Sequence, residues 1–142
     1  MERKVVYLTS TGAPDFHQDR IQTAGWRVEF TDNVETARAL IGKQRHCLGL
    51  IEFSKEHLNG QAGKIEQLLR STPGTGWIGL AAGELVPALL QMKFITGFLY
   101  DYHTLPLDPQ RLLHSMGHAY GMAQANRCNC DAAGKFDGAH GL

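Results

Sequence analysis

The sequence predicts an α/β fold in which five parallel strands form one doubly wound sheet. The first observation is that short runs rich in Val, Ile and Leu alternate with segments of helical periodicity. The second is length, because 142 residues with 43% hydrophobic content are enough for one domain with a buried core. No apolar run approaches the roughly 20 residues that a membrane-spanning helix needs.

The first strand and helix are separated by a clear break in the apolar pattern. A strand is predicted over residues 4–9, and Gly12 and Pro14 then interrupt the pattern. A helix is predicted over residues 15–24, and Gly25 is placed to end it. The next apolar run, residues 26–30, predicts the second strand.

The middle of the chain continues the alternation. Thr31 or Asp32 can cap a helix over residues 34–42, whose apolar residues fall on one face. Residues 46–53 form the most apolar segment and predict the third strand. A loop and a helix over about residues 61–71 follow. This helix again carries its apolar residues on one face, as expected for packing against a sheet.

Two further strands and two helices complete the pattern. The fourth strand is predicted over residues 77–81, and a helix over residues 84–94 tolerates Pro87 because proline fits the first turn. The fifth strand is predicted over residues 97–102. Asp108 then caps a last helix that we expect to end near Gln124.

Five βα units joined by right-handed crossovers favour a flavodoxin-like sheet with the strand order 2-1-3-4-5. In such sheets, ligand chemistry collects where the strands end, near the switch point between strands 1 and 3. Glu52 lies at that edge, at the end of the third strand. The segments 9–12, 81–83 and 103–106 are expected to lie beside it.

Charge and cysteine content exclude several functional classes. Lys and Arg together equal Asp and Glu, so no basic field attracts nucleic acid, and we expect no direct nucleic-acid binding and no membrane association. The short apolar stretch at the N-terminus does not fit a signal peptide, which predicts a cytoplasmic location. Three cysteines form no disulfide framework, and Cys47 reads as a buried apolar residue of the third strand.

Two segments carry a resemblance to a known family, CLGLIEFS at residues 47–54 and LPLDPQRLL at residues 105–113. They resemble the third strand and the stretch after the fifth strand of CheY-like receiver domains, over roughly residues 3–124. The longer stretch from Tyr100 to Ala123 is similar to the atypical receivers of VpsR-like sigma-54-dependent activators. The resemblance implies a receiver-like domain over residues 1–125. Residues 126–142 would form a linker toward a missing AAA+ domain.

A receiver that accepts a phosphoryl group needs an acidic pair, an acceptor aspartate, a hydroxyl and a lysine. On this resemblance, the acceptor position holds Glu52. At the other positions the required group is replaced: Thr9 and Ser10 stand where the acidic pair would be, Ala81 and Ala82 where the hydroxyl would be, and Leu105, before Pro106, where the lysine would be. The resemblance therefore implies a domain that has lost metal and phosphoryl chemistry, without cofactor or catalytic residue. It also implies a cis peptide bond before Pro106.

Two interpretations of Glu52 remain open. It can supply a permanent negative charge where a phosphorylated residue would stand, although a carboxylate reproduces neither the charge nor the oxygens of a phosphoryl group. Alternatively, it is a solvated carboxylate without a signalling role. A buried Glu52 would require backbone N–H groups or the hydroxyls of residues 9–11 as partners.

The last helix carries more apolar residues than one sheet contact needs, which predicts a dimer surface together with strand five. The residues assigned to it are Phe98, Tyr102, Leu113, Met116 and Tyr120. The alternative is an ordinary helix packed inward. Together with the resemblance, this surface implies a homodimer that contacts its own AAA+ domain and, through it, RNA polymerase carrying sigma-54.

Three alternatives have weaker support. A nucleotide or other small-molecule sensor is the alternative function; VpsR-like regulators respond to cyclic di-GMP, but no Arg cluster is assignable to it here. Residues 10–15 are comparable with an anion-binding loop of a flavin carrier, although Pro14 removes a donor. Cys128 and Cys130 with His114 and His118 are comparable with a metal site, but their spacing is not that of a zinc finger.

Overall fold

The computed structural model describes residues 3–10, 17–44 and 48–140, and its centre is a five-stranded sheet. The strand order is β2-β1-β3-β4-β5 and all paired strands run parallel. The predicted fold class and strand order are therefore confirmed. The strands are β1 (Arg3–Leu8), β2 (Trp26–Thr31), β3 (Leu48–Phe53), β4 (Gly76–Ala82) and β5 (Leu99–Leu105).

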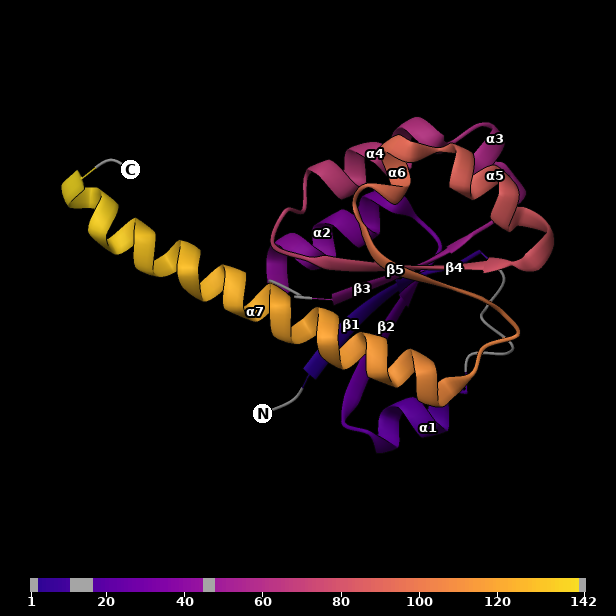
Figure 1. The fold of residues 1–142 in the computed structure, drawn as a ribbon, viewed down its shortest axis with the longest axis horizontal. Coiled ribbons are helices and arrows are strands. Elements are labelled where there is room, and N and C mark those ends of the chain that lie inside the picture. The colour runs from indigo at the N-terminus through magenta and orange to yellow at the C-terminus, as the bar shows by residue number, and fades with distance from the viewer. Residues whose placement is uncertain (1–2, 11–16, 45–47, 141–142) are drawn as a thin grey trace.

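Helices cover both faces of the sheet, as Figure 1 shows. One face carries α1 (Gln18–Thr23) and α7 (Pro109–His140). The other face is covered by a group of shorter helices: α2 (Val34–Gln44), α3 (Lys55–Asn59), α4 (Ala62–Arg70), α5 (Val86–Gln91) and α6 (Lys93–Thr96). A 3-10 turn, η1 (Gly83–Leu85), links β4 to α5.

Two apolar layers, one on each face of the sheet, form the core. The layer under α1 and α7 includes Tyr7, Leu50 and Ile78, and the layer under the other helices includes Leu8, Ile51 and Trp77. Successive strand residues alternate between the layers, as β geometry requires. Because β3 is central and covered on both sides, each of its six residues is buried.

The helix starts follow capping chemistry. Asp108 accepts hydrogen bonds from two backbone N–H groups in the first turn of α7, as predicted. At α2 the cap was predicted at Thr31 or Asp32, but Asn33 accepts the corresponding bonds, at 2.8 and 3.2 Å. The prediction missed the cap by one residue. Gly25 follows α1 with φ of 98°, a conformation that favours glycine.

Several predicted boundaries are wrong. Helix α3 was not predicted, and the helix expected over residues 84–94 is divided at Met92, whose ψ of 72° is not helical. Strand β5 begins and ends later than expected, running to Leu105. The part of the predicted third strand at residues 46–47, with Cys47, lies outside the described residues.

The last helix is longer than the sequence indicated. It was expected to end near Gln124, but α7 continues to His140. Figure 1 shows that its second half extends beyond the sheet. The division into a domain over residues 1–125 and a linker over residues 126–142 stays a prediction, and much of that expected linker is helical. None of the helices among the described residues is long and apolar enough to cross a bilayer.

An irregularity interrupts the pairing of β5, the edge strand. Trp77 of β4 pairs with Leu99, whereas the next residue, Ile78, pairs with Asp101. Tyr100 is therefore the additional residue of a β-bulge. The bulge falls near the start of β5, and Tyr100 is exposed there.

Replacing Gly49 by Ala should destabilise the protein. A Cβ at Gly49 would lie 2.5 Å from the buried Trp77 ring, whose Nε1 donates a hydrogen bond to Thr72 Oγ1 at 2.9 Å. Because that bond fixes the ring, we expect a loss of about 1–3 kcal/mol in the free energy of unfolding, measured by urea denaturation. Gly42→Ala in α2 is the control, since no described atom lies within 4 Å of the place where its Cβ would stand. An unchanged Gly49→Ala variant would contradict the packing.

Candidate functional site

Glu52 lies near the end of β3, on the sheet face that α1 and α7 cover. Leu48, Leu50 and Glu52 alternate onto this face because side chains repeat every second residue along a strand. The Glu52 side chain is nearly enclosed, since the residue is 9% exposed. A carboxylate in this position needs hydrogen-bond donors from the protein.

Two hydroxyl groups of β1 and the residue after it meet this need. Tyr7 donates its phenolic proton to Glu52 Oε1 at 2.8 Å, and Thr9 Oγ1 donates to the same oxygen at 3.1 Å. We call Tyr7, Thr9 and Glu52 the Glu52 cluster. All three residues are buried. Hydrogen bonds to a charged acceptor contribute more than neutral ones, about 1.5–3 kcal/mol each.

The phenol of Tyr7 is a permanent donor in this cluster. Burial raises the pKa of Tyr7 well above its ordinary value, and the neighbouring negative charge of Glu52 and the hydrogen bond to it raise it further. Tyr7 therefore keeps its proton at every pH at which the protein is expected to be folded. The bond to Glu52 does not depend on the ionisation of its donor.

The structure corrects one part of these interpretations. Glu52 is not a solvated carboxylate, because it is buried and accepts hydrogen bonds. The expectation that a buried Glu52 would find hydroxyl partners is confirmed for Thr9. Ser10 is exposed, and residue 11, the third expected hydroxyl, lies outside the described residues. Sequence reasoning missed Tyr7, which a polar tip inside an otherwise apolar strand could have indicated.

The receiver-like positions at the ends of β4 and β5 are apolar. Ala81 is buried in the layer opposite Glu52, and Ala82 is half-buried at the end of β4. Ala82 pairs with Leu105, which packs against the layer beneath α7. The Leu105–Pro106 bond is cis, as expected. The fold thus brings these strand ends together, but they supply no hydroxyl or cation of the receiver type.

The described part of the chain offers no cluster of three or more His, Cys, Asp or Glu residues that could hold a metal. His114 and His118 lie on one face of α7 with ring centroids 5.0 Å apart. Nothing is described of the side chains of Cys128 and Cys130, so the structure does not test the alternative of a metal site that includes them. Residues 11–15 of the compared anion-binding loop also lie outside the described residues.

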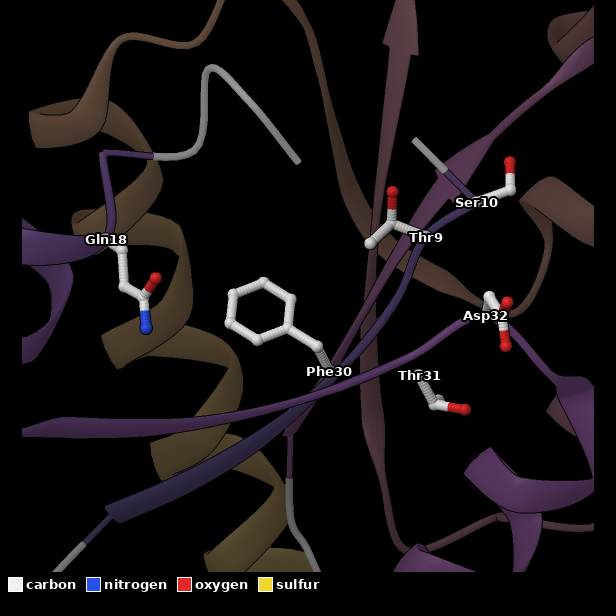
Figure 2. Close-up of a pocket in the computed structure, with 6 residues that line it drawn as sticks. All are labelled: Thr9, Ser10, Gln18, Phe30, Thr31 and Asp32. Carbon is white, nitrogen blue, oxygen red and sulfur yellow. The ribbon is translucent and has the colours of Figure 1, made fainter. Parts of the chain in front are cut away.

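An open pocket of about 530 Å³ adjoins the Glu52 cluster at the carboxyl ends of β1 and β2. Its described lining residues are Thr9, Ser10, Gln18, Phe30, Thr31 and Asp32. In Figure 2 the Phe30 ring lies between Gln18 on one side and Thr9 and Thr31 on the other. Thr9 belongs to both the pocket and the cluster, and the Phe30 and Tyr7 ring centroids are 5.4 Å apart. No Lys or Arg lines the described part of this pocket.

The predicted dimer surface is only partly available. Phe98 and Tyr102 are exposed, at 39% and 38%. The assignment of Met116 to this surface is wrong, because its side chain is fully buried between α7 and the sheet. Leu113 and Tyr120 are half-buried, and the Tyr120 ring meets Trp26 edge to face at 5.3 Å. The inward-packed alternative therefore describes much of the part of α7 whose side chains are described, from Pro109 to Ala125.

Comparison with known families gives one match, the VpsR domain, over residues 1–117. Among curated proteins, none matches the chain at a significant level. Solved structures share the fold at low identity. The CheY-like protein tadZ from Pseudomonas aeruginosa has a TM-score of 0.64 and 21% identity, over 83% of this chain and 99% of that chain.

Two further structures show how widely the fold is used. The signal receiver domain of a Luxo repressor protein from Vibrio parahaemolyticus has a TM-score of 0.70 and 14% identity, over 90% of this chain and 97% of that chain. A protein described as an adenylate cyclase from Rhodopirellula baltica has a TM-score of 0.76 and 10% identity, over 95% and 99%. At such identities the likeness shows the fold alone.

Replacing Tyr7 by Phe should destabilise the protein through the Glu52 cluster. The variant leaves a buried carboxylate with one donor fewer, so we expect a loss of about 1–3 kcal/mol in the free energy of unfolding, measured by urea denaturation. Tyr100→Phe is the matched control, because Tyr100 is exposed and should change stability by less than about 0.5 kcal/mol. Equal losses in the two variants would contradict a specific role for the Tyr7 hydroxyl.

Proposed function

The chain belongs to the VpsR domain family, and from this premise we propose that it is a non-enzymatic regulatory domain of a sigma-54-dependent transcription activator that works without phosphorylation. The family and the receiver-type fold make it a regulatory domain of response-regulator type. The proposal adds that its output depends on dimerisation and on contact with an AAA+ module. The protein would act in the cytoplasm, where transcription takes place.

The observation that carries the proposal is the bonding of Glu52. At the position of a receiver's acceptor aspartate, the carboxylate is buried and accepts two hydroxyl protons through Oε1. An acceptor carboxylate must instead face the phosphoryl donor and a divalent cation. Glu52 is engaged within the sheet, so we infer that it supports the fold in place of accepting a phosphoryl group.

The surrounding strand ends support the same inference. Transfer of a phosphoryl group develops negative charge that hydroxyl, ammonium and Mg²⁺ partners stabilise. Ala81, Ala82 and Leu105 provide none of these at the ends of β4 and β5. The permanent-charge interpretation of Glu52 is also weakened, because a buried carboxylate bonded to Tyr7 presents little charge to a partner.

Without phosphoryl chemistry, the domain would signal through contacts that its exposed side chains make with a partner. Three exposed aromatic residues follow one another closely along the chain: Phe94 on α6, Phe98 in the turn before β5 and Tyr102 on β5. The Arg70 guanidinium lies 5.3 Å from the centroid of the Phe98 ring, so the patch combines an aromatic face with a cation. Aromatic residues and Arg are enriched where protein interfaces are strongest. We assign the dimer contact to this patch.

The alternative function is a small-molecule sensor on the same scaffold. The observation in its favour is the open pocket of about 530 Å³ beside the Glu52 cluster. Its hydroxyls, Asp32 and the Phe30 ring suit an uncharged, hydrogen-bonding ligand better than a phosphate, because no cation lines its described part. Titration calorimetry with guanosine, an uncharged nucleoside, separates the two functions: saturable heat that Asp32→Ala abolishes would favour the sensor, and cyclic di-GMP, which carries two phosphates, should bind more weakly or not at all.

Phosphodonors should leave the domain unchanged. Incubation with acetyl phosphate or beryllofluoride and Mg²⁺ should give neither an increase in mass nor a shift in melting temperature, because Glu52 is held by Tyr7 and Thr9. Intact mass spectrometry and differential scanning fluorimetry measure the two quantities. A receiver with a complete acidic pair and lysine, treated in parallel, shows that the reagents are active. A stoichiometric adduct on this chain would overturn the proposal.

The aromatic patch should govern self-association. Phe98→Glu and Tyr102→Glu should raise the dissociation constant of a homodimer at least about tenfold, equivalent to about 1.4 kcal/mol, because each places a charge in an apolar contact. Sedimentation velocity over a range of concentrations measures this. Gln22→Glu adds the same charge at an exposed position of α1 and should leave the dissociation constant unchanged. Dimers that survive both patch substitutions would refute this assignment.

A further inference from the structure

A second polar cluster joins β5 to α7, away from the Glu52 cluster. His103 of β5 has its Nε2 atom 2.9 Å from Ser115 Oγ of α7. Ser115 Oγ donates to Asp101 Oδ2 of β5 at 3.1 Å. We call these three residues the β5–α7 relay. Ser115 is buried, and the His103 side chain is only 10% exposed.

The hydrogen bonds of the relay determine which of its atoms donate and which accept. Ser115 has one hydroxyl proton and gives it to the Asp101 carboxylate, so its oxygen must accept from His103. Neutral His103 therefore carries its proton on Nε2, as the network assigns it, and Nδ1 is left as the basic atom. The other carboxylate oxygen of Asp101 accepts from the Tyr102 backbone N–H at 2.8 Å.

The charged surroundings of His103 come from both elements of the junction. Asp101 lies on β5, Asp108 precedes α7 and Arg111 is in its first turn, while the paired residue of β4 is the apolar Leu80. Burial lowers the pKa of His103, the two carboxylates oppose this, and Arg111 adds to it. The net effect keeps His103 neutral at neutral pH.

Water and protons can reach the relay. A polar pocket of about 390 Å³ opens beside it, and its lining residues are Asp101, Tyr102, His103, Thr104, Pro106, Asp108 and Arg111. A proton from water can therefore add to the imidazole without unfolding of the chain. The product is an imidazolium with Nε2 at 3.7 Å from Asp101 Oδ2.

We propose that the β5–α7 relay makes the junction between β5 and α7 respond to acidification. Once His103 carries a positive charge, its buried side chain turns toward the polar pocket, where water and the carboxylates of Asp101 and Asp108 stabilise the charge. This movement breaks the bond between Nε2 and Ser115 Oγ, so α7 loses one of its two side-chain hydrogen bonds to β5 within the relay. The apolar contacts of Leu112 and Met116 keep the helix on the sheet, so the junction loosens without unfolding.

The sign of the effect on stability follows from the lowered pKa. Because folding favours neutral His103, the relay contributes its full stability above the ordinary histidine pKa of about 6.5. That contribution is lost as the pH falls through the lowered pKa of the folded state. The junction is therefore tight at neutral pH and loosens in acid. This inference does not depend on the proposed regulatory function.

Hydrogen exchange of the intact 142-residue chain tests the proposal. We expect the amides around Ser115 to lose at least about threefold in protection factor between about pH 7.5 and about pH 5, after correction for intrinsic exchange rates. His103→Gln is the matched control, since its amide can donate to Ser115 but cannot titrate in this range. This variant should keep its protection at both pH values.

A second variant and a direct titration complete the test. Ser115→Ala removes the α7 end of the relay, so protection of α7 should become independent of pH while His103 still titrates by NMR. In the wild-type chain, the NMR midpoint of His103 should lie below about 6.5. A wild-type loss of protection that His103→Gln reproduces would assign the effect to other histidines and overturn the proposal. So would constant protection of wild-type α7 across the range.

Discussion

A strand that is covered on both faces has no solvent for a charged side chain, and this constraint determines much of the structure around Glu52. Each residue of β3 is buried, so the carboxylate is stable only if neighbouring strands supply donors. Tyr7 of β1 and Thr9, which follows the strand, do so because both side chains reach the face that carries Glu52. A carboxylate at the end of β3 therefore requires hydroxyl groups at the end of the neighbouring strand β1.

The same constraint determines how the carboxyl ends of the central strands are occupied in this receiver-type fold. The Glu52 carboxylate accepts a hydrogen bond from Tyr7 inside the protein. Ala81, Ala82 and Leu105 make the ends of β4 and β5 apolar. What remains accessible is surface: an aromatic patch at Phe98 and Tyr102, an open pocket beside Thr9, and the junction at which α7 leaves the sheet. These features carry the proposals made for this protein.

Sequence patterns were sufficient for the fold because each strand and helix has its own period, and they placed Glu52 at the correct edge. They could not supply Tyr7 as its partner, since Tyr7 pairs with Leu50 and meets Glu52 only diagonally once the register is known. The exposure of Met116 was misjudged because apolar periodicity does not show how much of a helix lies over the sheet. Residues beyond Gln124 lack apolar periodicity, so the length of α7 had no sequence signal.

The bulge at Tyr100 has a consequence for how this edge of the sheet can be approached. A regular edge strand presents a row of free backbone groups onto which another chain can add as a further strand. Here an additional residue bends β5 near its start, and the Asp101 carboxylate occupies the Tyr102 N–H. Strand addition, including the runaway kind that leads to fibrils, is disfavoured along β5. A protein that docks here must recognise side chains rather than backbone.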